Sequence, residues 1–151
     1  MKILVSACLL GVRCCYDGGT HPQSELIRLC GQDQEIQLIP VCPEILGGLS
    51  TPRPPAEVWE GGVHNCEGTD VTAQYQKGAA EALRLAELYG CRTAILKERS
   101  PSCGCGLIYD GTFTHTRRPG SGVTAELLLQ HGIRVYGESS WQEALAEQRQ
   151  G

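Results

Sequence analysis

Short apolar runs alternate along the chain with longer stretches of helical periodicity. The runs are bounded by glycine, proline or polar residues, which is typical of buried strands. They cover residues 2–7, 36–41, 92–97 and 133–136. In the longer stretches apolar residues recur every three or four positions, which predicts helices. These stretches cover residues 22–30, 72–89, 123–130 and a last helix capped by Ser139.

Strands that alternate with helices form βαβ units and a mostly parallel sheet. We therefore predict an α/β fold, in which about four strands carry helices on both faces in a Rossmann-like arrangement. The chain is expected to form a single domain over residues 1–151, because its length supports one compact core. Residues 57–64 suggest a small hairpin around Gly61 and Gly62.

The remaining stretches are expected to be loops or helix boundaries. Residues 43–55 and 101–122 are rich in glycine and proline, which favours loops. For the long helix at 72–89, Asp70 or Thr72 is the expected N-cap and Gly90 the stop.

Composition and charge narrow the possible partners. Seventeen acidic residues against thirteen basic ones give a net charge of −4. Nucleic acid is an unlikely partner, because proteins that grip its backbone usually carry a basic surplus. No stretch approaches the about 20 consecutive apolar residues of a membrane span. Only seven residues precede Cys8, which is too few for a secretory leader, so we expect a cytoplasmic protein with no membrane contact.

Nine cysteines are the most unusual feature of the composition. No two of them form a C-x-x-C pair, and their number is odd. In the cytoplasm such thiols stay reduced and are available as metal ligands or nucleophiles. Cys14, Cys15 and Cys105 are interpreted as supporting or incidental, and Cys30 and Cys91 as packing residues.

Three cysteines occupy equivalent places in the predicted sheet. Cys8 follows the first strand, Cys42 the second and Cys103 the third. The carboxyl ends of parallel strands share one edge of the sheet, and neighbouring strands lie about 4.8 Å apart. The three thiols are therefore expected to converge on one metal ion or cluster. Thiolates select iron–sulfur clusters or zinc, and catalytic zinc usually has a histidine ligand; only His21 lies near these cysteines.

Polar residues in the same loops are candidates for the chemistry. Glu44, two residues after Cys42, is a candidate general base. Ser100, three residues before Cys103, is a candidate donor to a developing anion or a proton relay. The candidate substrate-binding residues are Asp17, Arg53 and Ser102.

Three motifs in this order resemble the thiouracil desulfidase family. They are SACLLG at 6–11, PVCPE at 40–44 with GGL at 47–49, and SPSCG at 100–104 with IYDGTF at 108–113. The resemblance covers residues 2–138. It implies a [4Fe-4S] cluster held by Cys8, Cys42 and Cys103, with one iron left open for the sulfur of a small thiolated base. It also places the catalytic carboxylate and hydroxyl on Glu44 and Ser100. Relatives often carry an arginine where this chain has Cys15.

The expected activity is therefore hydrolysis of a C–S bond that converts 2- or 4-thiouracil to uracil and sulfide. The open iron acts as a Lewis acid, and no net oxidation or reduction is needed. Two alternatives remain at this stage. One is desulfuration of thiolated RNA, and the other is a non-catalytic iron–sulfur or zinc module that binds or senses.

Overall fold

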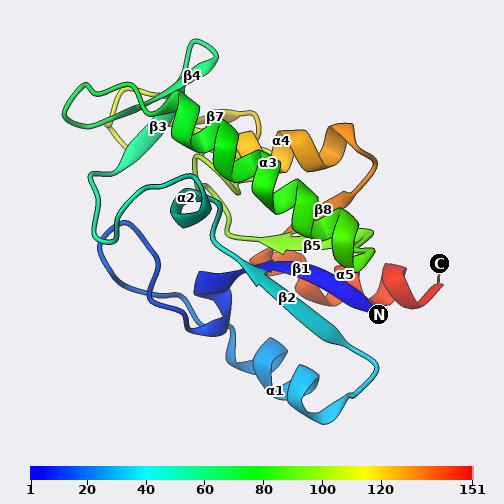
Figure 1. The fold of residues 1–151 in the computed structure, drawn as a ribbon. Helices are drawn as coiled ribbons and strands as arrows, with labels where there is room; N and C mark the ends of the chain where they lie inside the picture. The colour runs from blue at the N-terminus through cyan, green and yellow to red at the C-terminus, as the bar shows by residue number, and fades with distance from the viewer. Residues whose placement is uncertain (151) are drawn as a thin grey trace.

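A computed structural model describes residues 1–150 of the chain. Its centre is a four-stranded parallel sheet with the order β2-β1-β5-β8 (Figure 1). The strands are β1 (Lys2–Ser6), β2 (Gln37–Val41), β5 (Thr93–Leu96) and β8 (Arg134–Gly137). Strand β1 is flanked on both sides, since Leu4 pairs with Ile39 of β2 and with Ala94 of β5. The predicted Rossmann-like α/β sheet is confirmed.

Helices cover both faces of the sheet (Figure 1). One face carries α1 (Ser24–Gln32) and α5 (Trp141–Gln150), and the other carries α3 (Thr72–Tyr89) and α4 (Val123–Gln130). Because side chains alternate along a strand, β1 supplies both cores. Ile3 and Val5 join the core beneath α1 and α5, whereas Leu4 joins the core beneath α3 and α4. No helix within residues 1–150 combines the length and the hydropathy that a membrane crossing requires.

Two antiparallel hairpins and three short helices complete the described chain. The first hairpin pairs β3 (Ala56–Trp59) with β4 (Gly62–Asn65), as predicted. The second pairs β6 (Leu107–Tyr109) with β7 (Arg117–Pro119), where only a loop was expected. Its three-residue strands are too short to show a period of two. The short helices are η1 (Ala7–Leu10), α2 (Pro43–Leu46) and η2 (Glu138–Ser140).

Two helix starts differ from the predictions. The N-cap of α3 is Val71, and Asp70 instead accepts the N–H of Thr72 from one position further back, at 2.9 Å. Ser139 does not cap α5 but lies in η2, where its N–H and hydroxyl both donate to Glu98. Ser139 thus bonds to Glu98, which follows β5, instead of capping α5.

Two glycines let α2 lie directly on the backbone of α3. A Cβ atom on Gly47 would come within 1.9 Å of the carbonyl oxygen of Gln74, and one on Gly78 within 1.8 Å of that of Pro43. No side chain fits at either position. The single turn of α2, which was expected to be loop, is also favoured by Pro43 at its first position. This close packing holds the segment that carries Cys42 and Glu44.

We expect Gly78→Ala to lower the free energy of unfolding by about 1–3 kcal/mol, because the methyl group forces α2 away from α3. Gly31→Ala is the matched control, since Gly31 is also helical and nothing lies within 4 Å of its added Cβ. That variant should be neutral or gain about 0.5–1 kcal/mol. Urea denaturation followed by circular dichroism measures both; equal effects would contradict the close-packing argument.

Candidate functional site

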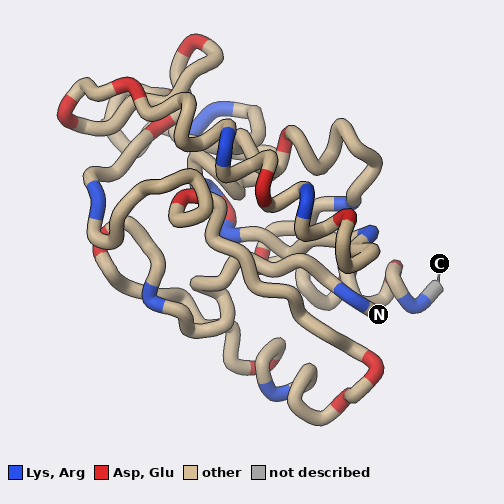
Figure 2. Tube along the Cα trace, viewed as in Figure 1, with Lys and Arg blue, Asp and Glu red and all other residues tan. Residues whose placement is uncertain are grey.

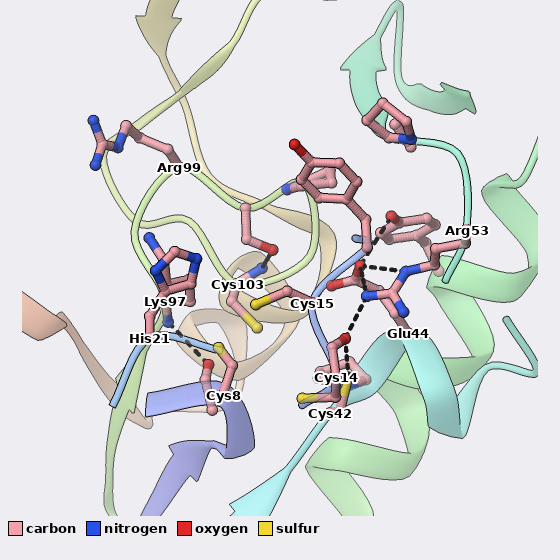
Figure 3. A pocket seen from close by; sticks show the side chains of 18 of the residues that line it. Cys8, Cys14, Cys15, His21, Cys42, Glu44, Arg53, Lys97, Arg99 and Cys103 are labelled. Atoms are coloured by element: carbon pink, nitrogen blue, oxygen red, sulfur yellow. Dashed lines mark hydrogen bonds and ion pairs between the residues drawn. The ribbon is translucent and has the colours of Figure 1, made fainter. Parts of the chain in front are cut away.

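A cavity of about 380 Å³ lies at the carboxyl ends of β1, β2 and β5. This is the edge at which open parallel sheets bind ligands, next to the point where the strand order reverses. Five thiols line it, and Figure 3 shows the five cysteines surrounding one space. They are Cys8, Cys14, Cys15, Cys42 and Cys103.

The three cysteines selected by the strand argument lie in the segments that follow β1, β2 and β5. Cys8 lies in η1, which follows β1, and Cys42 is the residue between β2 and α2. Cys103 lies in a turn after β5, where its N–H donates to the hydroxyl oxygen of Ser100 at 3.1 Å. Because β2, β1 and β5 are neighbours, all three thiols reach the same cavity. The predicted convergence is confirmed, whereas their role as ligands stays a prediction.

Cys14 and Cys15 were interpreted as supporting or incidental, and the structure places both at the cavity. The loop after η1 folds back over the sheet edge, held where the N–H of Arg53 donates to the carbonyl of Tyr16 at 2.8 Å. A second tie joins the Cys42 thiol to the carbonyl of Cys14 at 3.8 Å. The sequence feature that could have indicated this position is the pair of adjacent cysteines in the glycine-containing loop that follows Cys8. Cys105 is different, because it does not line the cavity and its thiol donates to the carbonyl of Val135.

The surroundings of Cys42 and Cys103 raise the pKa of both thiols. Burial and the nearby Glu44 carboxylate raise the pKa of Cys103 to about 12. A hydrogen bond with the Cys14 thiol, together with burial, raises the pKa of Cys42. Metal cations overcome such shifts, because thiolates are the form that binds them and the proton is released on binding.

The donor set fits an iron–sulfur cluster better than a single ion. Five cysteines line the cavity wall, and soft thiolates select iron–sulfur clusters and zinc. Within residues 1–150, no three Cys, His, Asp or Glu side chains stand close enough together to hold one metal ion. A four-iron cluster is larger than an ion, so its cysteine ligands must stand further apart.

Glu44 and Arg53 form a buried ion pair at the cavity. The Nη2 atom of Arg53 lies 2.7 Å from Oε2 of Glu44, and the two side chains are 5% and 13% exposed. Arg53 also bonds to the Cys14 carbonyl, the Ser50 carbonyl and the Thr51 hydroxyl. With the Nε and Nη2 bonds to Glu44, all five of its N–H groups have acceptors. Arg53 therefore has no donor left for a substrate, and the expectation that it binds one is replaced by an anchoring role.

The two oxygens of Glu44 have different surroundings. Oε2 accepts both bonds from Arg53 and a longer one of 3.4 Å from the hydroxyl of Tyr75. Burial and the Glu44 charge raise the pKa of Tyr75, so this hydroxyl stays a donor. Oε1 accepts no hydrogen bond from residues 1–150. Since Oε1 is not sealed from solvent either, it is free to act on a molecule in the cavity.

Ser100 also lines the cavity, with its proton available. Its Oγ accepts the N–H groups of Ser102 and Cys103, both at 3.1 Å, so its lone pairs are engaged within the turn. A hydroxyl in that position acts outward as a donor.

Two of the predicted substrate-binding residues, Asp17 and Ser102, do not line the cavity. Asp17 is exposed, and its Oδ1 accepts the N–H of Gly19 within its own turn. Ser102 is completely buried, and its hydroxyl pairs with that of Thr124 at 2.7 Å. Sequence proximity to a cysteine was the only signal for both residues, and it does not determine side-chain direction.

Comparison with known proteins gives matches that cover nearly the whole chain. A model of the 2-thiouracil desulfurase family matches residues 3–140. The uncharacterized protein YbbK of Bacillus subtilis (strain 168) is 44% identical over 153 residues, which cover 95% of this chain and 99% of that protein. A solved structure described as the [4Fe-4S]-dependent thiouracil desulfidase TudS is 43% identical, covers 99% of both chains and has a TM-score of 0.93.

Removing one member of the buried ion pair should be strongly destabilising. We expect Arg53→Ala to lower the free energy of unfolding by about 3–5 kcal/mol, because Glu44 is left as an uncompensated buried charge. Arg28→Ala is the control: its pair with Glu25 is also 2.7 Å long but more than half exposed. That loss should stay within about 1 kcal/mol. Urea denaturation of both variants tests the difference, and a loss in Arg53→Ala no larger than in the control would exclude an anchoring role.

Proposed function

The chain belongs to the 2-thiouracil desulfurase family, and on this basis we propose that it removes sulfur from a small thiolated pyrimidine base, with 2- or 4-thiouracil yielding uracil and sulfide. The enzyme is an iron–sulfur-dependent desulfidase, and its cofactor is a [4Fe-4S] cluster. The observation that carries this function is the joint presence, in one cavity, of sulfur donors and a carboxylate oxygen without a protein partner.

Cys8, Cys42 and Cys103 are the proposed cluster ligands. Cys8 and Cys42 lie in or beside short helices that follow β1 and β2, and Cys103 lies in a turn held by its own N–H bond to Ser100, whereas Cys14 and Cys15 belong to a longer loop. Rigid elements place ligands more accurately than loops do. Held by these three cysteines, a four-iron cluster would have one iron without a protein ligand and would supply a Lewis acid for the substrate's sulfur.

The side chains around the cluster site supply the proton transfers. Hydrolysis of the C–S bond consumes one water and releases one sulfide, with no change in net oxidation state. Oε1 of Glu44 accepts a proton from that water, while Arg53 holds Oε2 in place. The Ser100 hydroxyl donates a hydrogen bond to the negative charge that develops on the substrate, because its lone pairs already serve Ser102 and Cys103.

The charge distribution supports a small-molecule substrate over thiolated RNA. Basic and acidic residues are interspersed along the trace in Figure 2, and their sum is −4. RNA-binding surfaces usually concentrate positive charge. The free oxygen of Glu44 supports catalysis over a purely binding or sensing role, since it is held at the cavity wall where it can accept a proton. Nine cysteines without a disulfide support a reducing compartment such as the cytoplasm.

The ligand set is tested by metal analysis. Wild-type protein prepared anaerobically should carry about four irons and four sulfides per chain. Cys8→Ser, Cys42→Ser and Cys103→Ser should each lose the cluster, because three ligands are the minimum for a site with one open iron. Cys30→Ser and Cys91→Ser are the controls and should retain it, since neither residue lines the cavity. Loss of the cluster in Cys14→Ser or Cys15→Ser would reassign a ligand to the loop.

The role of Glu44 is tested in single-turnover desulfuration, followed by the loss of thiouracil absorbance. Wild-type protein should convert 2- or 4-thiouracil to uracil and sulfide. Glu44→Gln should retain the cluster, because Glu44 is not a proposed ligand and the amide oxygen can still accept the bonds from Arg53, but it should be slower by at least ~10²-fold, because an amide cannot accept the proton. The exposed Glu25→Gln is the control with wild-type rate. An intact cluster without turnover of either isomer would refute the proposed substrate, and a wild-type rate in Glu44→Gln would remove it as the base.

A further inference from the structure

Three glutamates line the cavity, Glu44, Glu57 and Glu98, and Glu57 reaches it from strand β3. Glu57 is only 8% exposed. Within residues 1–150, no Lys, Arg or His side chain lies at ion-pair distance from it. Burying a carboxylate is costly unless hydrogen bonds satisfy it, so its donors have to be identified.

The loop between β6 and β7 supplies two of these donors. Oε1 of Glu57 accepts the N–H of Gly111 at 3.0 Å and that of Phe113 at 3.1 Å. Both loop residues have positive φ angles, 96° and 59°, which turn the two N–H groups toward one oxygen. A Cβ atom on Gly111 would come within 2.6 Å of the Trp59 side chain, so the loop lies tightly against β3. The Glu57 side chain is thereby held in one orientation.

The other oxygen, Oε2, has no protein donor. It accepts no hydrogen bond from residues 1–150. Among residues 1–150, Nδ1 of His64 is the only buried side-chain nitrogen or oxygen that has neither a hydrogen-bond partner nor contact with solvent. Oε2 of Glu57 also lacks a partner but does not belong to this class. Oε2 therefore retains open surface, and Glu57 is a residue of the cavity wall. A carboxylate that is buried, fixed and half satisfied is suited to a ligand that brings an N–H donor.

Two cationic side chains of the wall, Arg53 and Lys97, are already bonded within the protein. The N–H groups of Arg53 all have acceptors, and Nζ of Lys97 lies 3.0 Å from Glu138 and donates to the Glu98 carbonyl at 3.1 Å. Ser100 is oriented as a donor. The ring N–H groups of a thiolated pyrimidine need an acceptor, and Glu57 provides one.

We propose that Oε2 of Glu57 accepts a hydrogen bond from a ring N–H of the thiolated base, and that this contact orients the ring and determines its recognition. The inference rests on the proposed function, because it assumes a base that carries an N–H group beside its thiocarbonyl. Glu57 would bind the ring while Glu44 serves the water, so that the two carboxylates perform different tasks in one cavity.

The substitution Glu57→Gln separates recognition from support of the loop. The amide oxygen can still accept the N–H groups of Gly111 and Phe113, whereas the amide NH₂ replaces the acceptor at Oε2 with a donor. In the cluster-loaded enzyme we expect KM for 2-thiouracil to rise by about 10- to 100-fold with kcat within a few-fold of wild type, since a hydrogen bond to a charged group is lost. Glu60→Gln, at the exposed tip of the same hairpin, should leave both constants unchanged.

Methylated substrates test the contact without relying on the variant's stability. 1-Methyl- and 3-methyl-2-thiouracil each lack one ring N–H. Wild-type enzyme should lose about 10- to 100-fold in kcat/KM on one of them beyond its loss on the other. In Glu57→Gln this preference should disappear, as expected for two changes that remove one interaction. Equal behaviour of both isomers in the wild type, or an unchanged preference in Glu57→Gln, would overturn the proposal.

Binding of uracil separates this inference from the proposed reaction. Uracil retains both ring N–H groups, so calorimetry should show weaker binding to Glu57→Gln than to wild type by the same factor. Weaker binding in an enzyme that fails to desulfurate thiouracil would support the Glu57 contact and refute the reaction. Turnover of thiouracil together with equal uracil binding by both proteins would support the reaction and overturn the Glu57 contact.

Discussion

The buried guanidinium of Arg53 holds the site together, because its five N–H groups join segments that are far apart in the sequence. It bonds to Glu44 on α2, to the Cys14 carbonyl in the loop after β1, and to the Ser50 carbonyl in its own loop. Its backbone N–H adds a bond to Tyr16. A buried charge tolerates little displacement, since each lost bond leaves a costly unpaired group. The carboxylate and the thiol-bearing loop are thereby fixed relative to each other.

The parallel sheet explains why so much of the site was predictable. Strand runs such as residues 2–7 and 92–97 are recognisable from their apolar character, and parallel pairing then requires their carboxyl ends to share an edge. The convergence of Cys8, Cys42 and Cys103 follows from this topology without any knowledge of side-chain direction. The family resemblance added the identity of the cluster, which strand ends alone leave open between iron–sulfur and zinc.

The features that sequence reasoning missed depend on contacts distant in sequence. The turn of α2 forms where glycine and proline indicated a loop, because Gly47 and Gly78 allow it to pack on α3. Arg53 was predicted to bind substrate because the local sequence does not show its acceptors. These acceptors lie in three separate segments. Cys15 reaches the cavity through the folding back of its loop. Elements with strong periodicity were thus predictable, whereas tertiary hydrogen bonds were not.

Glu44 and Glu57 are held in the same way, through one carboxylate oxygen, but by different donors. In each, one oxygen accepts two N–H groups of the protein and the other has no protein donor, although the guanidinium of Arg53 serves Glu44 and backbone N–H groups serve Glu57. A carboxylate held in this way cannot rotate without breaking both bonds, so its free oxygen needs little reorganisation when a ligand arrives. The sheet edge carries the thiols of the proposed cluster ligands, α2 carries the proposed base Glu44, and β3 carries Glu57, the proposed acceptor of a hydrogen bond from the thiolated base. Because these groups come from different elements, a change in β3 or in the loop between β6 and β7 would alter the proposed substrate contact and leave the cysteines that follow the sheet strands in place.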